Sequence, residues 1–274
     1  LTRDLQLIAT EGGRPPLWIA VDQEGGIVTR IKWTQYPQDL SVISAMSAFL
    51  FGQNRAGELM ELGVNMNLAP VLDSRHPKDA LYPRALHGNE DARGTEAKLY
   101  SNGHRSMGVI AVPKHFPGYD GIQFNPEFTV VPRVARTPDA TFFQRVVTEA
   151  RSPIVMASHV IYSDRDSAEP FPLSAAGIQF FRKTFGDKTL LMSDDLLSPA
   201  FQKRYSVIEL VDKSVASGLD LFLLGDPNKA LGFMFYIREL SKRDPALVKQ
   251  LTKNADRIVE LKEQFSDITW IRGH

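Results

Sequence analysis

The chain of 274 residues contains no cysteine, no excess of charge of either sign and no long apolar run. Without cysteine there can be no disulfide framework, no thiolate nucleophile and no cysteine-based zinc site. Lysine plus arginine and aspartate plus glutamate both number 32, so no net field attracts the chain to nucleic acid or to an anionic membrane. No stretch approaches the roughly 18 uncharged apolar residues of a transmembrane helix. These absences predict a globular protein with no nucleic-acid partner and no membrane-spanning segment.

The absence of cysteine also fits a reducing compartment, and we expect a cytoplasmic location. The first residues, LTRDLQLIATEGG, are typical of a helix rather than of a signal peptide. The chain starts with Leu1 rather than with methionine, which leaves open a preceding segment and with it a periplasmic or secreted location. The sequence does not indicate an oligomeric state.

What the sequence has instead is an alternation of short apolar runs, rich in β-branched residues, with longer segments of helical period. This pattern is typical of repeated βα units that build a parallel sheet. Strands are predicted at residues 17–22, 66–72, 109–115, 154–160, 190–194 and 219–224. Helices are predicted near residues 45–62, 94–107, 138–149, 174–184, 206–217, 228–241 and 246–264. Because no internal repeat or linker-like tract interrupts the pattern, residues 1–274 are predicted to form a single domain.

Polar residues recur where these predicted strands end. They are Asp22, Asp73, Lys114 with His115, His159, and Asp194 with Asp195. In a β/α barrel, all the strand ends of one face surround a single pocket. The alternative is a set of solvated strand ends with ordinary ion pairs. The segment KHFPG at residues 114–118 is the more specific signal, because a Lys and a His buried side by side need partners, and the hydroxyls of a bound sugar can supply them.

Five segments, in this order and spacing, resemble family 3 glycoside hydrolases, in particular the single-domain β-N-acetylglucosaminidases (β-hexosaminidases) of bacterial cell-wall recycling. The segments are AVDQEGG at 20–26, NLAPVLD at 67–73, KHFPG at 114–118, MASHVIYSD at 156–164 and MSDDL at 192–196. The resemblance covers nearly the whole chain. It implies an α/β fold of the (β/α)8 TIM-barrel type, with the sugar held at the carboxyl ends of the strands. Since only six strands are predicted where such a barrel needs eight, we expect its first strands to be missing from this chain or irregular.

The resemblance also implies roles for individual residues. Asp194, directly after Ser193, corresponds to the catalytic nucleophile of the family. The residues that correspond to positions holding the terminal sugar are Asp22, Arg30, Arg84, Lys114 and His115. His159 is expected in the same pocket, either in contact with the substrate or as support for the pocket wall. No metal ion and no cofactor is implied.

The loop after KHFPG departs from the family pattern. In the glucosaminidases this loop carries Asp-x-His, whose His is the general acid/base, whereas the corresponding positions here hold Asn125, Pro126 and Glu127. An amide cannot exchange a proton in this way, but a carboxylic acid with a raised pKa is the usual acid of glycosidases. Glu127 is therefore the candidate acid/base. The alternative is that Glu127 is a solvated charge on a surface loop.

These observations predict a retaining exo-glycosidase that hydrolyses a terminal β-linked N-acetylglucosamine, or a related sugar, from a glycoconjugate such as a cell-wall fragment. Its partner would be a small carbohydrate substrate. One alternative is a β-glucosidase-like member of the family, because Asp-x-His marks the amino-sugar specialists. Another is a non-catalytic sugar-binding homologue that has lost its acid, although the retained Asp194 argues against it.

Overall fold

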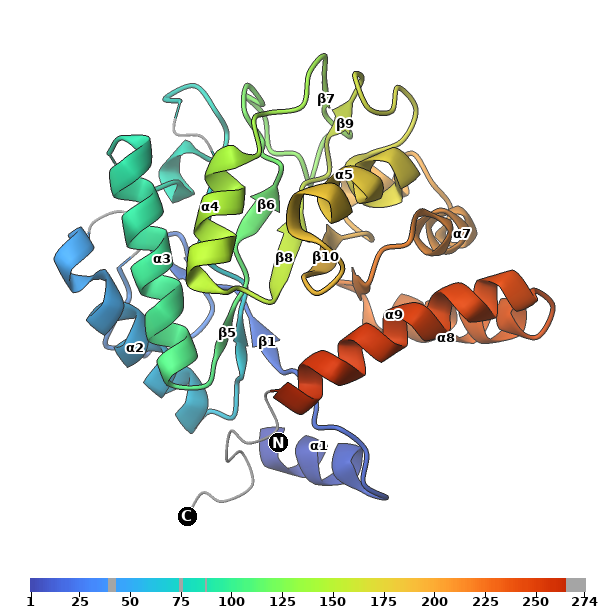
Figure 1. The fold of residues 1–274 in the computed structure, drawn as a ribbon, viewed down its shortest axis with the longest axis horizontal. Coiled ribbons are helices and arrows are strands. Elements are labelled where there is room, and N and C mark those ends of the chain that lie inside the picture. Colours follow the sequence, from blue (N-terminus) through green and yellow to red (C-terminus); the bar gives the residue numbers. More distant parts are fainter. Residues whose placement is uncertain (39–42, 74–75, 87, 265–274) are drawn as a thin grey trace.

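The structure is a computed structural model that describes residues 1–38, 43–73, 76–86 and 88–264 (Figure 1). Its strands are β1 (Ala20–Val21), β2 (Gln23–Gly25), β3 (Val28–Thr29), β4 (Met66–Asn67), β5 (Ile110–Ala111), β6 (Lys114–Phe116), β7 (Arg133–Val134), β8 (Ile154–Ala157), β9 (Ile161–Tyr162), β10 (Leu190–Asp195) and β11 (Leu221–Leu223). Its helices are α1 (Thr2–Thr10), α2 (Ala45–Glu61), α3 (Glu90–Ser106), α4 (Thr141–Ala150), α5 (Ala175–Phe185), α6 (Pro199–Gln202), α7 (Val207–Ser217), α8 (Pro227–Ser241) and α9 (Pro245–Gln264), with 3-10 turns η2 (Tyr82–Arg84) and η3 (Phe171–Leu173).

The central strands pair in parallel in two sheets, ordered β1-β4-β5 and β11-β10-β8-β6. One stretch of chain belongs to both sheets, because β5 pairs with β4 and β6 pairs with β8. A parallel bridge between Val71 and Lys114 joins them. The six predicted strands therefore lie side by side in chain order, and the prediction of an α/β fold built on parallel strands is confirmed. Strand pairing in the described residues runs from β1 at one edge to β11 at the other, and β1 does not pair with β11. A closed barrel of eight strands therefore stays a prediction.

Both faces of the inner strands β4, β5, β6, β8 and β10 are buried, as expected for parallel strands covered on two sides, whereas the edge strands β1 and β11 are partly exposed. Successive side chains point to opposite faces, so Val155 and Leu191 pack with the helices around these strands. Alternate residues face the other way and form a second apolar cluster. Its members on the strands, or within one residue of a strand end, are Met66, Leu68, Ile110, Val112, Ile154, Met156, Leu190 and Met192. Leu261 of α9 completes this cluster. A layered filling by large apolar side chains is what the interior of a β/α barrel contains.

The helices lie where the sequence predicts them, with ends that differ by a few residues. Figure 1 shows α2, α3 and α4 on one side of the strands, α5 and α7 on the other, and α8 beside α9. The N-terminal stretch is helical as expected, forming α1. Ser206 and Glu209 form the complete capping box that starts α7. In the described part of the chain, no helix combines the length and the apolar character needed to cross a membrane.

The structure adds short elements that the sequence did not predict, and they lie near the carboxyl ends of the strands. The antiparallel hairpin β2–β3 follows β1 directly, and α6 follows β10. The hairpin depends on Gly25, whose φ of 95° is in the left-handed region that favours glycine. A Cβ atom at this position would also overlap the carbonyl oxygen of Gln38. These elements bring further side chains to the strand ends.

Candidate active site

A cavity of about 520 Å³ opens at the carboxyl ends of the strands. Seven of the eight site residues predicted from the sequence line it, namely Asp22, Arg30, Arg84, Lys114, His115, Glu127 and Asp194. The eighth predicted residue, His159, is described by the structure but does not line the cavity. The strands, and not the order of the residues along the chain, bring these side chains together.

The floor of the cavity is centred on Lys114, which is only 2% exposed. Its ammonium group lies 2.7 Å from Oδ1 of Asp22 and 2.6 Å from Oε1 of Glu24. Burial by itself would lower the pKa of Lys114, but the two carboxylates outweigh it and the pKa is raised. Lys114 is therefore a permanent cation at neutral pH, and it holds both carboxylates in place.

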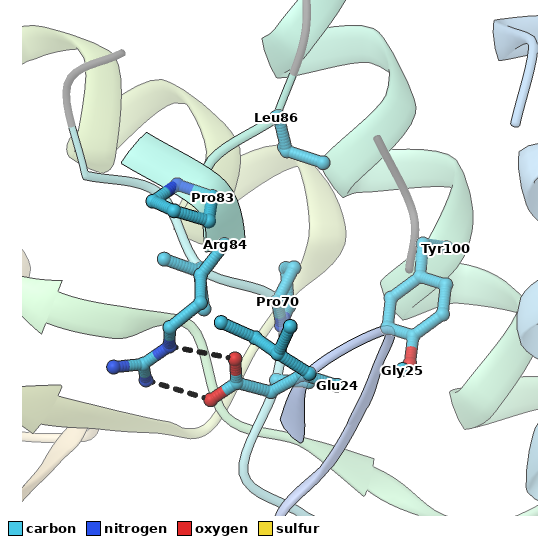
Figure 2. A pocket seen from close by; sticks show the side chains of 10 residues that line it. Glu24, Gly25, Pro70, Pro83, Arg84, Leu86 and Tyr100 are labelled. Carbon is cyan, nitrogen blue, oxygen red and sulfur yellow. Dashed lines mark hydrogen bonds and ion pairs between the residues drawn. The ribbon is translucent and has the colours of Figure 1, made fainter. Parts of the chain in front are cut away.

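Glu24 is a functional candidate that the sequence analysis missed. Arg84 donates to it through two nearly equal hydrogen bonds, from Nε to Oε2 at 2.9 Å and from Nη2 to Oε1 at 2.8 Å. Figure 2 shows this pairing, with the guanidinium of Arg84 lying opposite the carboxylate of Glu24. Burial would raise the pKa of Glu24, but Lys114 and Arg84 bring it down to about 2. Glu24 thus links the two cations of the cavity floor.

The backbone of Glu24 is fixed from behind by Arg55 of α2. The Arg55 side chain is fully buried and donates to the carbonyl oxygens of Glu24 at 2.7 Å and of Tyr36 at 2.6 Å. Because one guanidinium binds two segments of the chain, the hairpin β2–β3 is tied to the loop that follows it. This arrangement directs the Glu24 carboxylate toward the cavity floor.

His115 is held between two carboxylates. Its Nδ1 lies 2.7 Å from Oδ2 of Asp73, and its Nε2 lies 3.7 Å from Oδ2 of Asp194. The short contact orients the ring, so that Nε2 faces Asp194. Asp73 also accepts from the backbone N–H of Tyr119 at 3.0 Å. The sequence placed Asp73 at a strand end but did not identify it as the partner of His115.

His159 is fully buried behind the cavity. Its ring packs on Phe201 with ring centroids 4.2 Å apart, and its backbone N–H donates to the hydroxyl of Tyr119 at 2.8 Å. Burial lowers the pKa of His159. Of the two roles left open by the sequence, this placement favours support of the wall behind Asp194.

Asp194 is the last residue but one of β10, lines the cavity, and is 8% exposed. Its Oδ1 accepts from the backbone N–H of Asp195 at 2.8 Å. Burial would raise the pKa of Asp194, but nearby His159, His115 and Lys114, together with this hydrogen bond, outweigh it and lower the pKa. Asp194 is accordingly an ionised carboxylate at neutral pH.

The adjacent Asp195 has a different environment. Its Oδ1 accepts from the backbone N–H groups of Leu197 at 2.9 Å and Gly225 at 2.8 Å. These bonds connect the segment after β10 with the segment after β11. Asp195 therefore orients the backbone around Asp194.

Glu127 is half-buried at the side of the same cavity. Its backbone is anchored at several points, because its N–H donates to Oδ1 of Asn125 at 2.9 Å and its carbonyl accepts from the N–H of Ala200 at 2.9 Å. Lys203 also donates to the carbonyl of Phe128 at 3.2 Å. The loop that carries Glu127 is thus tied to the helix α6, a few residues after Asp194.

The pKa of Glu127 is raised, in contrast to that of Asp194. Burial is the main cause, and repulsion by the Asp194 carboxylate adds to it, while His115, Arg84 and Lys114 act in the opposite direction. Two carboxyl groups whose pKa values are moved apart can act as an acid and as an anion at the same pH. The cavity therefore holds an ionised carboxylate and a carboxyl group that keeps its proton more readily.

The site contains no arrangement typical of a bound metal ion. In the parts of the chain covered by the structure, no group of three or more His, Asp or Glu side chains is placed to hold one. The carboxylates of Asp22 and Glu24 are instead neutralised by Lys114 and Arg84.

Comparison with known proteins assigns the chain to a family. The model of the glycosyl hydrolase family 3 N terminal domain matches residues 3–261. The chain belongs to glycoside hydrolase family 3. It is thus a glycoside hydrolase, an enzyme class that acts on O-glycosyl bonds, as the sequence predicted.

The relatives of this family 3 hydrolase include proteins named β-hexosaminidase and solved structures with the same fold. A β-hexosaminidase of Pasteurella multocida is 28% identical over 251 residues, which cover 85% of this chain and 70% of the relative. A β-hexosaminidase of Nitrosomonas eutropha is 32% identical over 79% of this chain and 67% of the relative. The β-N-acetylhexosaminidase structure from Beutenbergia cavernae superposes with a TM-score of 0.86 at 23% identity, over 96% of this chain and 83% of its own. A family 3 β-N-acetylglucosaminidase from Paenibacillus superposes with a TM-score of 0.85 at 26% identity, over 100% of this chain and 54% of its own.

Proposed function

We propose that this family 3 hydrolase is a retaining exo-glycosidase that releases a terminal β-linked N-acetylglucosamine, with Asp194 as nucleophile and Glu127 as acid/base. The observation that carries the proposal is that one cavity is lined by two carboxyl groups with opposite pKa shifts. A retaining glycosidase needs such a pair, because one group must attack as an anion while the other supplies a proton.

Asp194 is suited to the nucleophilic step. It is ionised, and its Oδ1 is already occupied by the Asp195 amide at 2.8 Å, so Oδ2 is the oxygen that would attack the anomeric carbon. Since His115 Nε2 lies 3.7 Å from that Oδ2, the ring can steady the carboxylate before attack. The result is a covalent glycosyl-enzyme that water later hydrolyses.

Glu127 is suited to the proton transfers. A carboxyl group whose pKa is raised by burial and by Asp194 can protonate the glycosidic oxygen as the bond breaks. The resulting Glu127 carboxylate can then remove a proton from the water that attacks the glycosyl-enzyme. Glu127 would thus do the work that Asp-x-His does in the glucosaminidases that the sequence resembles.

Asp22 is suited to hold a hydroxyl of the terminal sugar. Its side chain is 33% exposed, whereas those of Lys114 and Glu24 are 2% and 6% exposed, so Asp22 presents the accessible oxygens of the floor network. An ionised carboxylate can accept from two neighbouring hydroxyls. Arg30, which is exposed on the cavity wall, would add a donor to the same sugar.

The choice of N-acetylglucosamine rests on the relatives, which are named β-hexosaminidase or β-N-acetylglucosaminidase. A terminal residue of a cell-wall fragment is the glycoconjugate that we propose. The assay compares 4-nitrophenyl β-glycosides of N-acetylglucosamine and of glucose, with NMR of the first-formed anomer. We expect the β anomer from the amino sugar. Faster cleavage of the glucoside would favour a β-glucosidase, and an α anomer would contradict retention.

Glu127→Gln tests the acid/base role separately. The variant should hydrolyse alkyl glycosides very slowly, while the 4-nitrophenyl glycoside, whose leaving group needs little protonation, should still form the glycosyl-enzyme. Added azide should then restore turnover of the activated substrate, since a small anion can attack without a general base. Wild-type rates on both substrates would show that Glu127 is not the acid. Binding of sugar by the wild type without turnover of either substrate would favour a non-catalytic homologue.

A further inference from the structure

In the described residues, a second cavity of about 520 Å³ is lined by residues other than those of the candidate active site. One wall is the loop after β3, over residues 31–36, and the other is the C-terminal half of α2. Arg30 lines the first cavity and Ile31 lines the second, so one loop borders both. The volume is within the range of small-molecule sites, about 300–1,000 Å³. We call this second cavity the α2 groove.

The aromatic surface of the α2 groove is the ring of Trp33, which is 74% exposed. The other aromatic lining residue, Tyr36, is half-buried, and its ring packs edge-on against Phe51 with ring centroids 6.0 Å apart. Covering an exposed indole with apolar surface is favourable, and flat partners stack on it. A sugar ring is such a partner, because one of its faces consists mainly of C–H groups.

The loop that carries Trp33 is tied to α2 through Glu58. The Oε2 atom of Glu58 accepts from the hydroxyl of Thr34, and its Oε1 atom accepts from the backbone N–H of Gln35 at 2.8 Å. The hydroxyl of Thr34 also accepts from the backbone N–H of Tyr36 at 3.0 Å. The segment directly after Trp33 is therefore fixed. Because both oxygens of Glu58 are engaged, this carboxylate is not available as the counter-ion of a cationic ligand.

The remaining polar side chains of the α2 groove suit hydroxyl groups. Gln35, Gln53 and Asn54 carry amides, which can both donate and accept, and Glu61 adds an acceptor. Lys32 is exposed but does not line the groove, so an anion such as phosphate would find no lysine or arginine among the described lining residues. A cationic ligand would have only Glu61 as its counter-ion. The groove therefore fits an uncharged ligand with several hydroxyl groups and a flat apolar face, which describes a sugar ring.

A glycine keeps the helical wall of the groove open. Gly57 lies inside α2 and lines the groove, although glycine in a helix interior costs about 0.5–1 kcal/mol relative to alanine. Packing does not require it, because a Cβ atom at this position would meet only Cε of Met107 within 4 Å, at an ordinary contact distance of 3.8 Å. The missing side chain leaves room for a ligand beside Trp33.

We propose that the α2 groove is a second saccharide-binding site, separate from the catalytic cavity, which binds N-acetylglucosamine residues of a glycan by stacking a sugar ring on Trp33. The choice of this sugar rests on the proposed function, since the glycoconjugate proposed above contains it. The amides of the groove and Glu61 bind the hydroxyl and acetamido groups of the ring. Because one loop borders both cavities, a glycan held in the groove lies beside the catalytic cavity.

The test is calorimetry with a β-1,4-linked tetramer of N-acetylglucosamine whose rings are joined by sulfur, so that wild-type enzyme can be titrated without hydrolysis. We expect a binding component that Trp33→Ala weakens by at least about tenfold. Gly57→Gln should weaken the same component by filling the groove, and it should not lower stability, because glutamine favours a helix more than glycine does. Asp22→Ala, which alters the catalytic cavity, should leave this component unchanged. Both groove variants should keep the wild-type kcat/KM for 4-nitrophenyl N-acetylglucosaminide.

Two further variants serve as controls. Trp33→Phe keeps a flat ring and should retain part of the binding, and Phe235→Ala removes a 63% exposed phenylalanine of α8 and should change neither binding nor activity. Unchanged tetramer binding in both Trp33→Ala and Gly57→Gln would overturn the inference, as would an equal loss of binding and of kcat/KM in both. A wild-type dimer that Trp33→Ala dissociates in ultracentrifugation would assign the groove to a second copy of the chain instead. If the tetramer bound in the groove but wild-type enzyme did not hydrolyse the 4-nitrophenyl glycoside, the proposed function would be wrong and this inference would stand.

Discussion

Replacing Glu24 with glutamine removes the negative charge that Lys114 and Arg84 share. The pKa of Glu24 falls from its usual 4.5 to about 2 in the folded protein. Each pKa unit corresponds to about 1.4 kcal/mol, so the interactions of the ionised carboxylate stabilise the fold by about 3 kcal/mol. The Glu24 side chain is only 6% exposed, so solvent screens these interactions weakly. Breaking a buried ion pair by removing one partner typically costs about 3–5 kcal/mol, which is consistent with this figure.

The assay is urea denaturation of wild type and Glu24→Gln at several pH values. Because the folded-state pKa is lowered, the stabilisation by Glu24 is fully present above pH 4.5 and is lost as the pH falls through about 2. The variant should therefore be less stable by about 3 kcal/mol at pH 7, and the difference should shrink as the pH falls below 4.5. We also expect kcat/KM to fall at least about tenfold, because Lys114 and Arg84 lose the group that orients them.

Glu149→Gln is the matched control, since it makes the same chemical change in an exposed ion pair, with Lys98 at 3.0 Å. Exposed pairs contribute about 1 kcal/mol or less, so this variant should stay close to wild type at every pH. The reasoning about Glu24 would be refuted by a loss of stability below about 1 kcal/mol at pH 7, or by a difference that stays constant down to pH 2.

Three other predictions concern the reaction itself. Asp194→Ala should abolish hydrolysis with an unchanged circular dichroism spectrum, since no other nucleophile is in place, while Asp195→Asn should lower activity less. Near-wild-type turnover by Asp194→Ala would contradict the assignment of Asp194 as nucleophile. Asp22→Ala or Lys114→Ala should weaken binding of free N-acetylglucosamine by roughly 1–3 kcal/mol in calorimetry, and unchanged affinity in both would mean that the sugar binds elsewhere. Activity should fall at high pH, where Glu127 with its raised pKa loses its proton, and at low pH, where Asp194 with its lowered pKa gains one. Glu127→Gln should remove the loss of activity at high pH. If this loss persisted in the variant, a group other than Glu127 would cause it.

Much of the fold could be predicted from the sequence, because local periodicity reports burial. The apolar runs that became β8 and β10 are buried on both faces, so they lack polar residues until they reach the cavity. The same contrast between an apolar run and a polar end marked Lys114 and Asp194. The helices followed from their period and from caps such as Ser206 with Glu209.

The sequence by itself thus determined where the strands, the helices and the polar strand ends lie along the chain, and it carried the motifs of the family resemblance, all of which are local features of the chain. Only the tertiary structure decided which of these side chains pair. Glu24 and Arg84 are 60 residues apart, and Glu127 is held by Ala200 of a helix that follows a different strand. Nothing in local periodicity distinguishes Glu24 from an exposed glutamate. Its pKa is lowered by Lys114 and Arg84, which lie on two other segments of the chain. Pairing across such separations is set by how the strands and loops pack, which is why the floor network of the cavity appears only in the folded chain.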